Sequence, residues 1–374
     1  MIIYWSMILW VPIIYFFYTA NNKEAVKLTD YNINRGIQYK IPMSYAIVVF
    51  AYFIFWIGMR TYVADTSAYI NTFNNISSDF SYGWSQIDWD GKRPGFDIFN
   101  LFFKCFISQD FHWWLMFIAI VSGLCLMSVL RRYSVDFFYS SFLFMAMQTF
   151  VWMLNGMRQF ICVSILFACC NWIKEGRIVK FIIVVLLLST VHLTAIMMIP
   201  VYFVVRAEPW SRRIALFIAA IVLICIFSEP FFSGVDSALG NTAYAGATNQ
   251  FEEDDGVNPL RVLFYAIPPI IAFWKREEIK LYYDKLPMLK MSINMSLAAF
   301  CLYLVGMFTS GILIGRLPVY CDIYNLLLIP YIFHTAFKGT DRKILIILYT
   351  ILLLIYFYFN IRGMNYVSDL TGTI

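Results

Sequence analysis

The chain has 374 residues, of which 61% are hydrophobic and only 14% are charged, and its mean hydropathy is +0.70. This composition argues against a soluble globular domain and is typical of a polytopic α-helical membrane protein. The net charge of +5 does not indicate nucleic-acid binding, because the basic residues flank apolar runs and form no separate basic face.

Apolar runs divide the chain into candidate membrane-spanning helices. A bilayer core of about 30 Å needs roughly 20 apolar residues per helix, which leaves room for about twelve spans. No linker, repeat or low-complexity segment indicates a second domain, so we expect residues 1–374 to form a single transmembrane domain. The expected spans lie at about 2–19, 41–58, 111–130, 137–154, 157–173, 178–190, 194–205, 214–228, 259–274, 289–309, 317–337 and 343–360.

The first run lacks a basic leader and a small-residue cleavage site, so we expect it to stay in the membrane. The eight Cys residues lie mostly inside apolar runs and show no CxxC pattern. We interpret them as small apolar side chains at helix interfaces.

The distribution of Lys and Arg predicts the orientation. Cytoplasmic loops of membrane proteins are enriched in these residues, and six loops hold 20 of the 28. These six are therefore expected in the cytoplasm, with both termini outside. They lie at about 20–40, 131–136, 174–180, 206–213, 275–290 and 338–343. Two long loops, at about 59–110 and 229–258, then face outward, and the apolar stretch "RPGFDIFNLFFKCFI" in the first is expected to lie along the membrane surface.

The segment "STVHLTAIMM", residues 189–198, sits in an apolar run with basic clusters at both ends. A single crossing of 178–205 would place those clusters on opposite sides of the membrane. Two short helices meeting near His192 would keep both in the cytoplasm, and because neither could cross alone, the tip would lie in a protein-lined cavity. A helical hairpin is therefore our prediction, with a single tilted span as the alternative.

Four outward Arg residues stand close to the ends of spans: Arg60, Arg158, Arg261 and Arg316. Each could be an ordinary interfacial anchor, since an Arg near a span end can extend to the interface. As a set, on a side otherwise poor in cations, they suit a phosphate site, because guanidinium offers forked hydrogen bonds that ammonium does not.

His192 is one of three His residues. His112 and His334 are expected to be interfacial. A buried neutral imidazole at position 192 could take a proton from a hydroxyl group or donate a hydrogen bond to phosphate, although a helix-packing role is equally open. Asp65 could cap a helix that begins at Thr66, pair with Arg60, or orient a sugar hydroxyl.

Several further residues belong to the candidate site. Asp322 enters the eleventh span, where a carboxylate is costly unless it is paired, so we expect it to pair with an outward Arg. Tyr69, Gln159 and Tyr324 lie next to the charged candidates along the sequence. The motif "DWD", Asp88 to Asp90, resembles a metal-binding DxD, but we interpret it as a solvated loop. No P-loop, GxSxG or HExxH motif is present in the sequence.

These pieces together resemble the EpsG/Wzy group of polysaccharide polymerases. The matching stretches are "RTYVADTSAY", "NGMRQFICVSILF", "VHLTAIMMIPVY" and "GRLPVYCDIYNLLLIPYIF", in this order over about residues 60–335. One departure is that relatives often carry an acidic residue before the "PGF"-like turn, where this chain has Arg93, so any role of that acid is in doubt here.

The resemblance implies a GT-C-like helical membrane glycosyltransferase in the bacterial cytoplasmic (inner) membrane, with its active site facing the periplasm. Such an O-antigen or capsule polymerase joins polyprenyl (undecaprenyl)-diphosphate-linked oligosaccharides, works in membrane lipid, and is expected to work with a chain-length regulator protein; no nucleic-acid partner is expected.

On this interpretation Arg158 and Arg316 stabilise the leaving diphosphate, while His192, or else Asp65, is the base. The remaining members would contact substrate: Arg60, Arg261, Tyr69, Gln159, Asp322 and Tyr324. Guanidinium groups neutralise the donor, so we expect no metal and no cofactor, and direct displacement would invert the anomeric configuration.

Two other classes of membrane protein are alternatives. A lipid-linked oligosaccharide flippase or other transporter often carries inverted repeats and a polar site at the midplane, and this sequence shows no repeat. A membrane acyltransferase that modifies glycans would be expected to show a His–acid or HxxxD pattern, and "HLTAI" has no acid at that offset.

Overall fold

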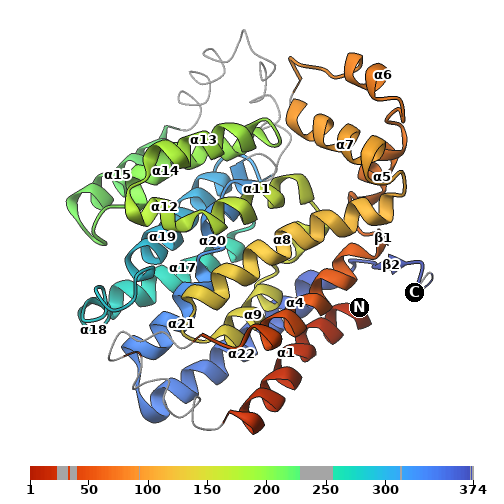
Figure 1. Ribbon diagram of the computed structural model, residues 1–374. Coiled ribbons are helices and arrows are strands. Elements are labelled where there is room, and N and C mark those ends of the chain that lie inside the picture. The colour runs from red at the N-terminus through yellow and green to blue at the C-terminus, as the bar shows by residue number, and fades with distance from the viewer. Residues whose placement is uncertain are drawn as a thin grey trace.

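The computed structural model describes residues 1–22, 33, 40–91, 93–227, 256–311, 314–370 and 372. The described chain is mostly helical (Figure 1). Its helices, including the 3₁₀ helices η1 and η3, are α1 (Ile2–Asn21), α4 (Met43–Gly58), α5 (Thr66–Asn74), α6 (Phe80–Ser85), α7 (Pro94–Phe106), α8 (Phe111–Tyr133), α9 (Phe137–Ala146), α10 (Val151–Leu154), α11 (Met157–Ala168), α12 (Cys170–Glu175), α13 (Ile178–Ser189), η1 (Leu193–Met197), α14 (Met198–Val205), α15 (Arg212–Ile226), α17 (Pro259–Trp274), α18 (Arg276–Lys280), α19 (Leu289–Met307), η3 (Ile314–Arg316), α20 (Val319–Asp322), α21 (Asn325–Ala336) and α22 (Gly339–Ile361).

Every predicted apolar run coincides with helix in this structure. Within the described residues, α1, α8, α19 and α22 are long and apolar enough to cross a membrane on length and composition. Three predicted spans are interrupted. The run at 157–173 breaks at Cys169, between α11 and α12. The run at 137–154 breaks after α9, where Gln148 has a φ of +65°, and the run at 317–337 breaks between α20 and α21. The chain is thus a polytopic membrane protein, while the count of twelve crossings and the GT-C-like arrangement stay predictions.

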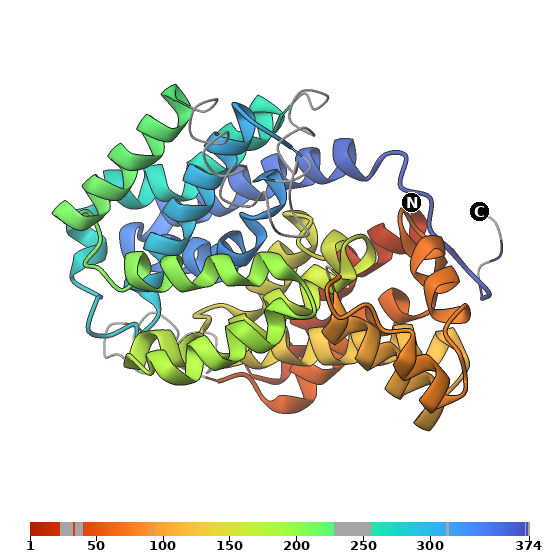
Figure 2. The same cartoon turned by 90° about the horizontal axis from the view of Figure 1, so that it is seen from above.

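One end of the bundle, which we call the α7 end, gathers the first outward loop and both termini. Strand β1 (Arg60–Tyr62) pairs antiparallel with β2 (Val367–Ser368). The Tyr366 hydroxyl donates to the carbonyl of Trp56 at 2.6 Å, and the Tyr4 and Tyr366 rings are 6.0 Å apart. Figures 1 and 2 both show the two termini on the same side of the molecule as α5–α7.

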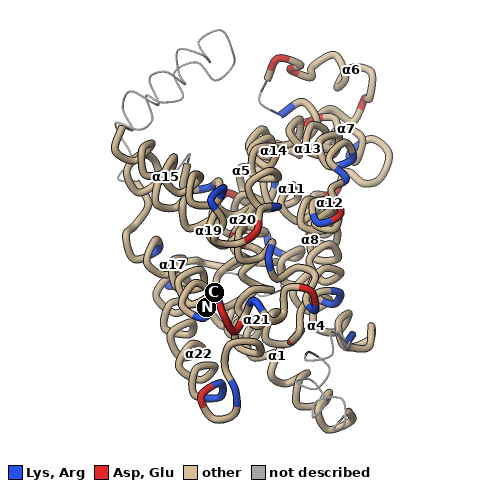
Figure 3. The backbone as a smooth tube through the Cα atoms, turned by 90° about the vertical axis from the view of Figure 1, so that its left-hand side faces the viewer, with Lys and Arg blue, Asp and Glu red and all other residues tan. Residues whose placement is uncertain are grey.

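The opposite end, which we call the α18 end, gathers the cation-rich loops. Arg131 Nε donates to the carbonyl of Ile41 at 3.0 Å. Lys290 and Glu208 form an ion pair at 2.6 Å, and the Lys275 ammonium lies 5.5 Å from the centre of the Phe337 ring. Figure 3 shows charged residues concentrated near turns and loops, with most of each long helix uncharged. The predicted grouping of basic loops at one end is therefore confirmed for the described residues. Most of the first basic loop, about 20–40, and the second outward loop, about 229–258, up to residue 255 lie outside them.

The helical hairpin at 178–205 is confirmed, and the single tilted span is wrong. Helix α13 ends at Ser189 and the chain resumes with η1 and α14 after a break at residues 190–192. The start and the end of the hairpin meet, because Arg206 Nη1, just after α14, donates at 2.7 Å to the carbonyl of Ile173, just before α13. Phe181 of α13 packs against Tyr202 of α14 with ring centres 5.4 Å apart. Since α13 has 12 residues, it is about 18 Å long, well short of a bilayer core.

The tip of this hairpin is fixed by the first outward loop. The amide of Gly95 donates to the carbonyl of Thr190 at 2.9 Å. A Cβ at Gly95 would lie 2.1 Å from Thr190 Oγ1 and 3.0 Å from its carbonyl carbon, so only glycine permits this approach. The turn at the start of α7 therefore holds the segment that carries His192.

Cys substitutions can test the hairpin in intact cells. We expect Thr190→Cys, which is exposed at the tip, to react with a membrane-impermeant thiol reagent added outside. Arg177→Cys and Glu208→Cys, both at exposed side chains of the α18 end, should react only after permeabilisation. Labelling of 177 and 208 from opposite sides of the membrane would contradict the hairpin.

Candidate functional site

The imidazole of His192 is positioned by a chain of side-chain hydrogen bonds. His192 Nδ1 lies 2.7 Å from Thr194 Oγ1, and Thr194 Oγ1 lies 3.1 Å from the Tyr320 hydroxyl of α20. The His192 amide donates to the carbonyl of Leu188 at 2.9 Å, which completes the end of α13. The ring is therefore held through one nitrogen, which leaves Nε2 for another group.

Gln159 connects this chain to Arg316. Its Nε2 donates to the carbonyl of Arg316 at 3.0 Å and lies 3.4 Å from Thr194 Oγ1. The side chain is buried, and because the amide donates to a carbonyl its orientation is fixed by that bond. Gln159, predicted as a substrate contact, is placed as a residue that sets the relative positions of His192 and Arg316.

Arg158 approaches the same point from the start of α11. Gly156, with a φ of +84°, forms the N-cap of this helix and allows the tight turn from α10. The Arg158 guanidinium lies 6.0 Å from the centre of the Phe96 ring of α7, and its Nε is buried without a hydrogen-bonding partner among the described residues. Arg158 and Arg316 both lie close enough to His192 to act on it electrostatically.

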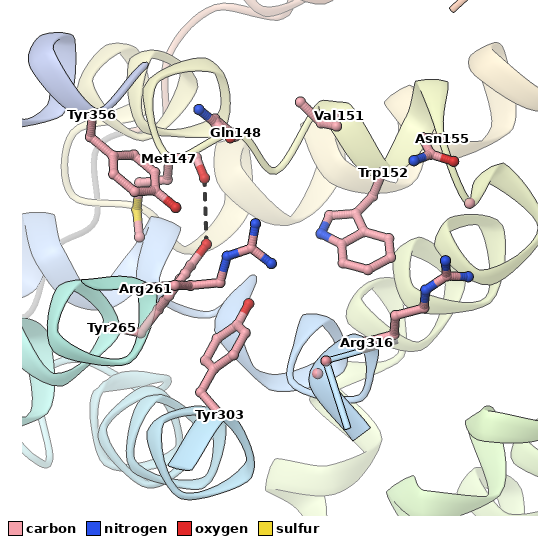
Figure 4. Close-up of a pocket in the computed structure, with 13 residues that line it drawn as sticks. Met147, Gln148, Val151, Trp152, Asn155, Arg261, Tyr265, Tyr303, Arg316 and Tyr356 are labelled. Carbon is pink, nitrogen blue, oxygen red and sulfur yellow. Dashed lines mark hydrogen bonds between the residues drawn. The ribbon is translucent and has the colours of Figure 1, made fainter. Parts of the chain in front are cut away.

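His192, Thr194, Gln159, Arg158 and Arg316 form a cluster. A cavity of about 250 Å³ adjoins it, with Arg316 and Arg261 among the side chains that line the cavity. Figure 4 shows the two guanidinium groups on either side of the Trp152 indole, with Gln148 near Arg261 and Asn155 near Arg316. The break after α9 lines this space, and Gln148 Nε2 there is buried with no partner in the described part of the chain. A site with two cations and unpaired donors is suited to an anion.

Three tyrosines form the wall behind Arg261. Tyr265 and Tyr303 stack with ring centres 4.5 Å apart, and Tyr356 lies beside Arg261. Tyr265 donates through its hydroxyl to the carbonyl of Met147 at 3.4 Å, which helps to hold the interrupted segment.

Asp322 does not pair directly with an arginine as predicted. It is buried, and its Oδ2 accepts a hydrogen bond from the Tyr303 hydroxyl at 2.6 Å. No ion pair to Asp322 is found among the described residues, although Arg261 is near enough to act on it electrostatically. The carboxylate therefore acts on the cavity through Tyr303, which it orients.

Arg60 is placed inside the protein and does not line the cavity. It is 1% exposed, and its guanidinium donates to Thr66 Oγ1 at 3.1 Å, to the carbonyl of Ile57 at 2.5 Å and to Met157 Sδ at 3.1 Å. Burial lowers the pKa of Arg60 to about 10, so it stays charged at neutral pH. These contacts join β1 and α5 to the start of α11, one residue before Arg158.

Asp65 and Tyr69 differ in their distance from the cluster. The helix predicted at Thr66 does begin there, but the exposed Asp65 side chain neither caps it by a hydrogen bond nor bonds to Arg60. Tyr69, one turn further along α5, lies near Arg158, Arg316 and Arg93. Burial raises the pKa of Tyr69 while the neighbouring Arg158 lowers it, so the phenol is a neutral hydrogen-bonding group at physiological pH.

Tyr324 does not line the cavity, although the sequence predicted it as a substrate contact. The side chain is buried and packs edge-on against Phe167 with ring centres 4.9 Å apart. It lies near Cys169 and Cys170, toward the α18 end. The break between α20 and α21 turns it away, and Tyr320, one turn earlier, reaches the His192 chain instead.

Sequence reasoning missed Thr194, Tyr320, Trp152, Gln148 and Tyr303. The spacing of Thr194, two residues after His192, was the one available signal for a His partner. The others become neighbours only through contacts between distant segments. Among the described residues no group of three or more His, Cys, Asp or Glu side chains could hold a metal ion, so Asp88 and Asp90 of "DWD" belong to no such group.

The geometry can bind an anion beside a base. Two arginines act on one imidazole, a third lines the adjoining cavity, and the imidazole keeps one nitrogen for a hydroxyl or phosphate. This arrangement suits transfer from a diphosphate leaving group, with charge building up where the guanidinium groups lie.

Of three comparisons with known proteins, one found a match, and it covers most of the chain. No curated protein and no solved structure matches the chain. The sequence model of the EpsG family matches residues 43–371, which include every segment that contributes to the cluster and the cavity. Because this match extends over far more than half of the sequence, the chain belongs to the EpsG family.

Proposed function

We propose that the protein is a membrane glycosyltransferase that polymerises polyprenyl-diphosphate-linked oligosaccharide repeat units into a surface polysaccharide such as an O-antigen. Membership of the EpsG family supports a polymerase of this kind. The observation that carries the proposal is that Gln159, the residue after Arg158, donates to the carbonyl of Arg316 and lies 3.4 Å from Thr194, the partner of His192, so three separate segments meet at one point.

The proposed reaction is a glycosyl transfer that uses the positive charges of the arginines. A sugar hydroxyl of the acceptor unit attacks the anomeric carbon of the donor, and the bond from that carbon to the diphosphate oxygen breaks with its electron pair going to the diphosphate. Arg158 and Arg316 stabilise the negative charge that develops on this leaving group. Direct displacement inverts the anomeric configuration, and in this proposal the guanidinium groups take the neutralising role that a metal ion has in other transferases.

The hydroxyl proton passes to His192 Nε2. When Thr194 accepts a hydrogen bond from Nδ1–H, the other ring nitrogen carries the lone pair that a base requires. Gln159 and Tyr320 hold Thr194 in place. Tyr69 is close enough to the guanidinium groups to contact the same substrate, and Arg261 completes the phosphate or sugar contacts in the cavity.

The proposed location is supported by the distribution of basic loops. In this proposal the α18 end, which holds the basic loops, faces the cytoplasm, and the site at the α7 end opens outward, toward the periplasm of a bacterial inner membrane. The lipid-linked substrates are expected in the outer leaflet, where the polyprenyl chain stays in membrane lipid, and a chain-length regulator protein is a proposed partner.

The leaving-group role can be tested by substitution. We expect Arg158→Ala and Arg316→Ala each to lower the polymerisation rate about 10²–10³-fold, the effect of losing one preorganised charge donor. Lys at either position should restore little, because one ammonium does not reproduce the fork. The measurement is the formation of long chains from purified lipid-linked repeat units, together with the ladder of surface polysaccharide in cells.

Arg362→Ala is the matched control, since this Arg is exposed at the same end and follows α22; its rate should be unchanged. Single repeat units should still reach the cell surface in the arginine variants, which separates a polymerase from a flippase. Long chains made by the Arg158→Ala/Arg316→Ala double variant would show that the leaving-group role is wrong.

The positioning of His192 makes a separate prediction. Thr194→Val keeps the shape of the side chain and removes the partner of Nδ1, so kcat should fall about 10²-fold, at the lower end of the contribution of a general base, while KM changes little. Thr340→Val, exposed at the start of α22, should leave both constants unchanged. An unaltered kcat for Thr194→Val would remove His192 from the role of base.

A further inference from the structure

A second cavity lies outside the diphosphate site, in the layer formed by α5, α6 and α7. Its volume is about 630 Å³, within the range of roughly 300–1,000 Å³ that small-molecule sites occupy. Figure 1 shows these three helices grouped beside the outer part of α8. Among the described residues its lining combines amides, hydroxyls, carboxylates and one guanidinium with an apolar wall: Thr72, Asn75, Ile76, Ser77, Tyr82, Gly83, Gln86, Ile87, Asp88, Arg93, Asp97 and Leu101.

The walls of this cavity are rigidly supported. The Lys104 ammonium of α7 donates to the last carbonyls of α5, at 3.0 Å to Phe73 and 2.7 Å to Asn74. The Phe73 ring stacks on Trp114 of α8 at 4.8 Å, and the Trp114 indole donates to Asn100 Oδ1 at 3.0 Å. A buried cation at the carboxyl end of α5 and this aromatic stack fix α5 and α7 against α8, so the cavity is preformed.

The chemistry of the lining favours an uncharged polar ligand. Asp88 and Asp97 oppose a single guanidinium, Arg93, which is paired with Asp97 at 3.4 Å. Because this guanidinium is already paired with a carboxylate, the lining offers a diphosphate less than the Arg158 and Arg316 side chains do. Gln86 and Asn75 each offer a donor and an acceptor on one amide, the pattern that pairs with vicinal hydroxyl groups. Tyr82 exposes 61% of its surface at the rim, and its ring face can pack against the C–H groups of a sugar ring.

Helix α7 connects the two sites. Phe96 lies under the Arg158 guanidinium, while the next residue, Asp97, lines the second cavity and is near Arg158 as well. Two residues before Asp97, Gly95 holds the hairpin tip through Thr190. A glycan whose diphosphate is bound by Arg158 could therefore extend along the first turn of α7 into this cavity.

We propose that the cavity between α5, α6 and α7 is a glycan-binding subsite, which holds sugars of the lipid-linked oligosaccharide away from the bond that reacts. It rests on the proposed function. Its residues set which repeat unit is accepted, and they take no part in the chemical step.

The test is binding of a free oligosaccharide to purified full-length protein. The probe is the single repeat unit released by mild acid from the lipid-linked precursor that accumulates in a strain without this protein. We expect the Gln86→Ala/Tyr82→Ala double variant to bind it at least tenfold more weakly, and to show a raised KM for lipid-linked substrate with kcat little changed. Both side chains are exposed, so their loss should not unfold the helices.

Asn71→Ala is the matched control, because this Asn is exposed on α5 and does not line the cavity; its affinity should equal that of the wild type. Arg158→Ala should keep oligosaccharide binding while losing polymerisation. If wild-type protein does not bind the probe, or if the double variant binds it unchanged, the subsite is refuted and the polymerase proposal is untouched. If wild-type protein makes no polymer from lipid-linked units, the proposed function itself is refuted.

Discussion

The arrangement of the site depends on a helical hairpin that is too short to cross a membrane. Helix α13 leads away from the α18 end and α14 returns to it, and the start and the end of the hairpin are joined there by the hydrogen bond from Arg206 to Ile173. Their tip leaves backbone groups unpaired by any helix, and at membrane depth such groups must find partners in the protein. The amide of Gly95 supplies one of them at Thr190. This requirement is what brings α7 against the tip and places His192 beside Arg158.

The charges of the site follow from the same constraint. Arg60 is costly to bury, yet its charge is stabilised by three contacts that fix the segment before Arg158. In contrast, Arg316 lines the cavity, and the buried Nε of Arg158 has no hydrogen-bonding partner among the described residues. Asp322 could have neutralised Arg261 directly, but it accepts its hydrogen bond from Tyr303. The cavity thus retains a positive character that an anionic ligand can satisfy, which a direct carboxylate–guanidinium pair would have removed.

Much of the fold could be predicted from the sequence, because apolar runs and basic loops are local signals. The hairpin followed from the two basic clusters around His192, and the structure places Arg158 and Arg316 near enough to that His to act on it electrostatically. Tyr324 and Asp322 could not be assigned correctly, because the break between α20 and α21 changes which side chains face the cavity. Arg60 could not be distinguished from the other arginines, since the partners that enclose it include Met157, 97 residues away. The cavity between α5, α6 and α7 has no local signature at all.

The position of α7 has a consequence for how such an enzyme can change its substrate. Its first turn presents Phe96 to the guanidinium of Arg158 and Asp97 to the second cavity. The diphosphate is common to every lipid-linked donor, whereas the sugars differ. Phe96 therefore lies beside the group that binds the constant part of the ligand, and Asp97 lines the cavity proposed for the variable part. Most positions of α6, Tyr82 among them, are exposed, so substitutions there cost little stability. They can alter which glycan is held without disturbing the Gly95–Thr190 contact that keeps the base in place, because that contact uses only backbone atoms.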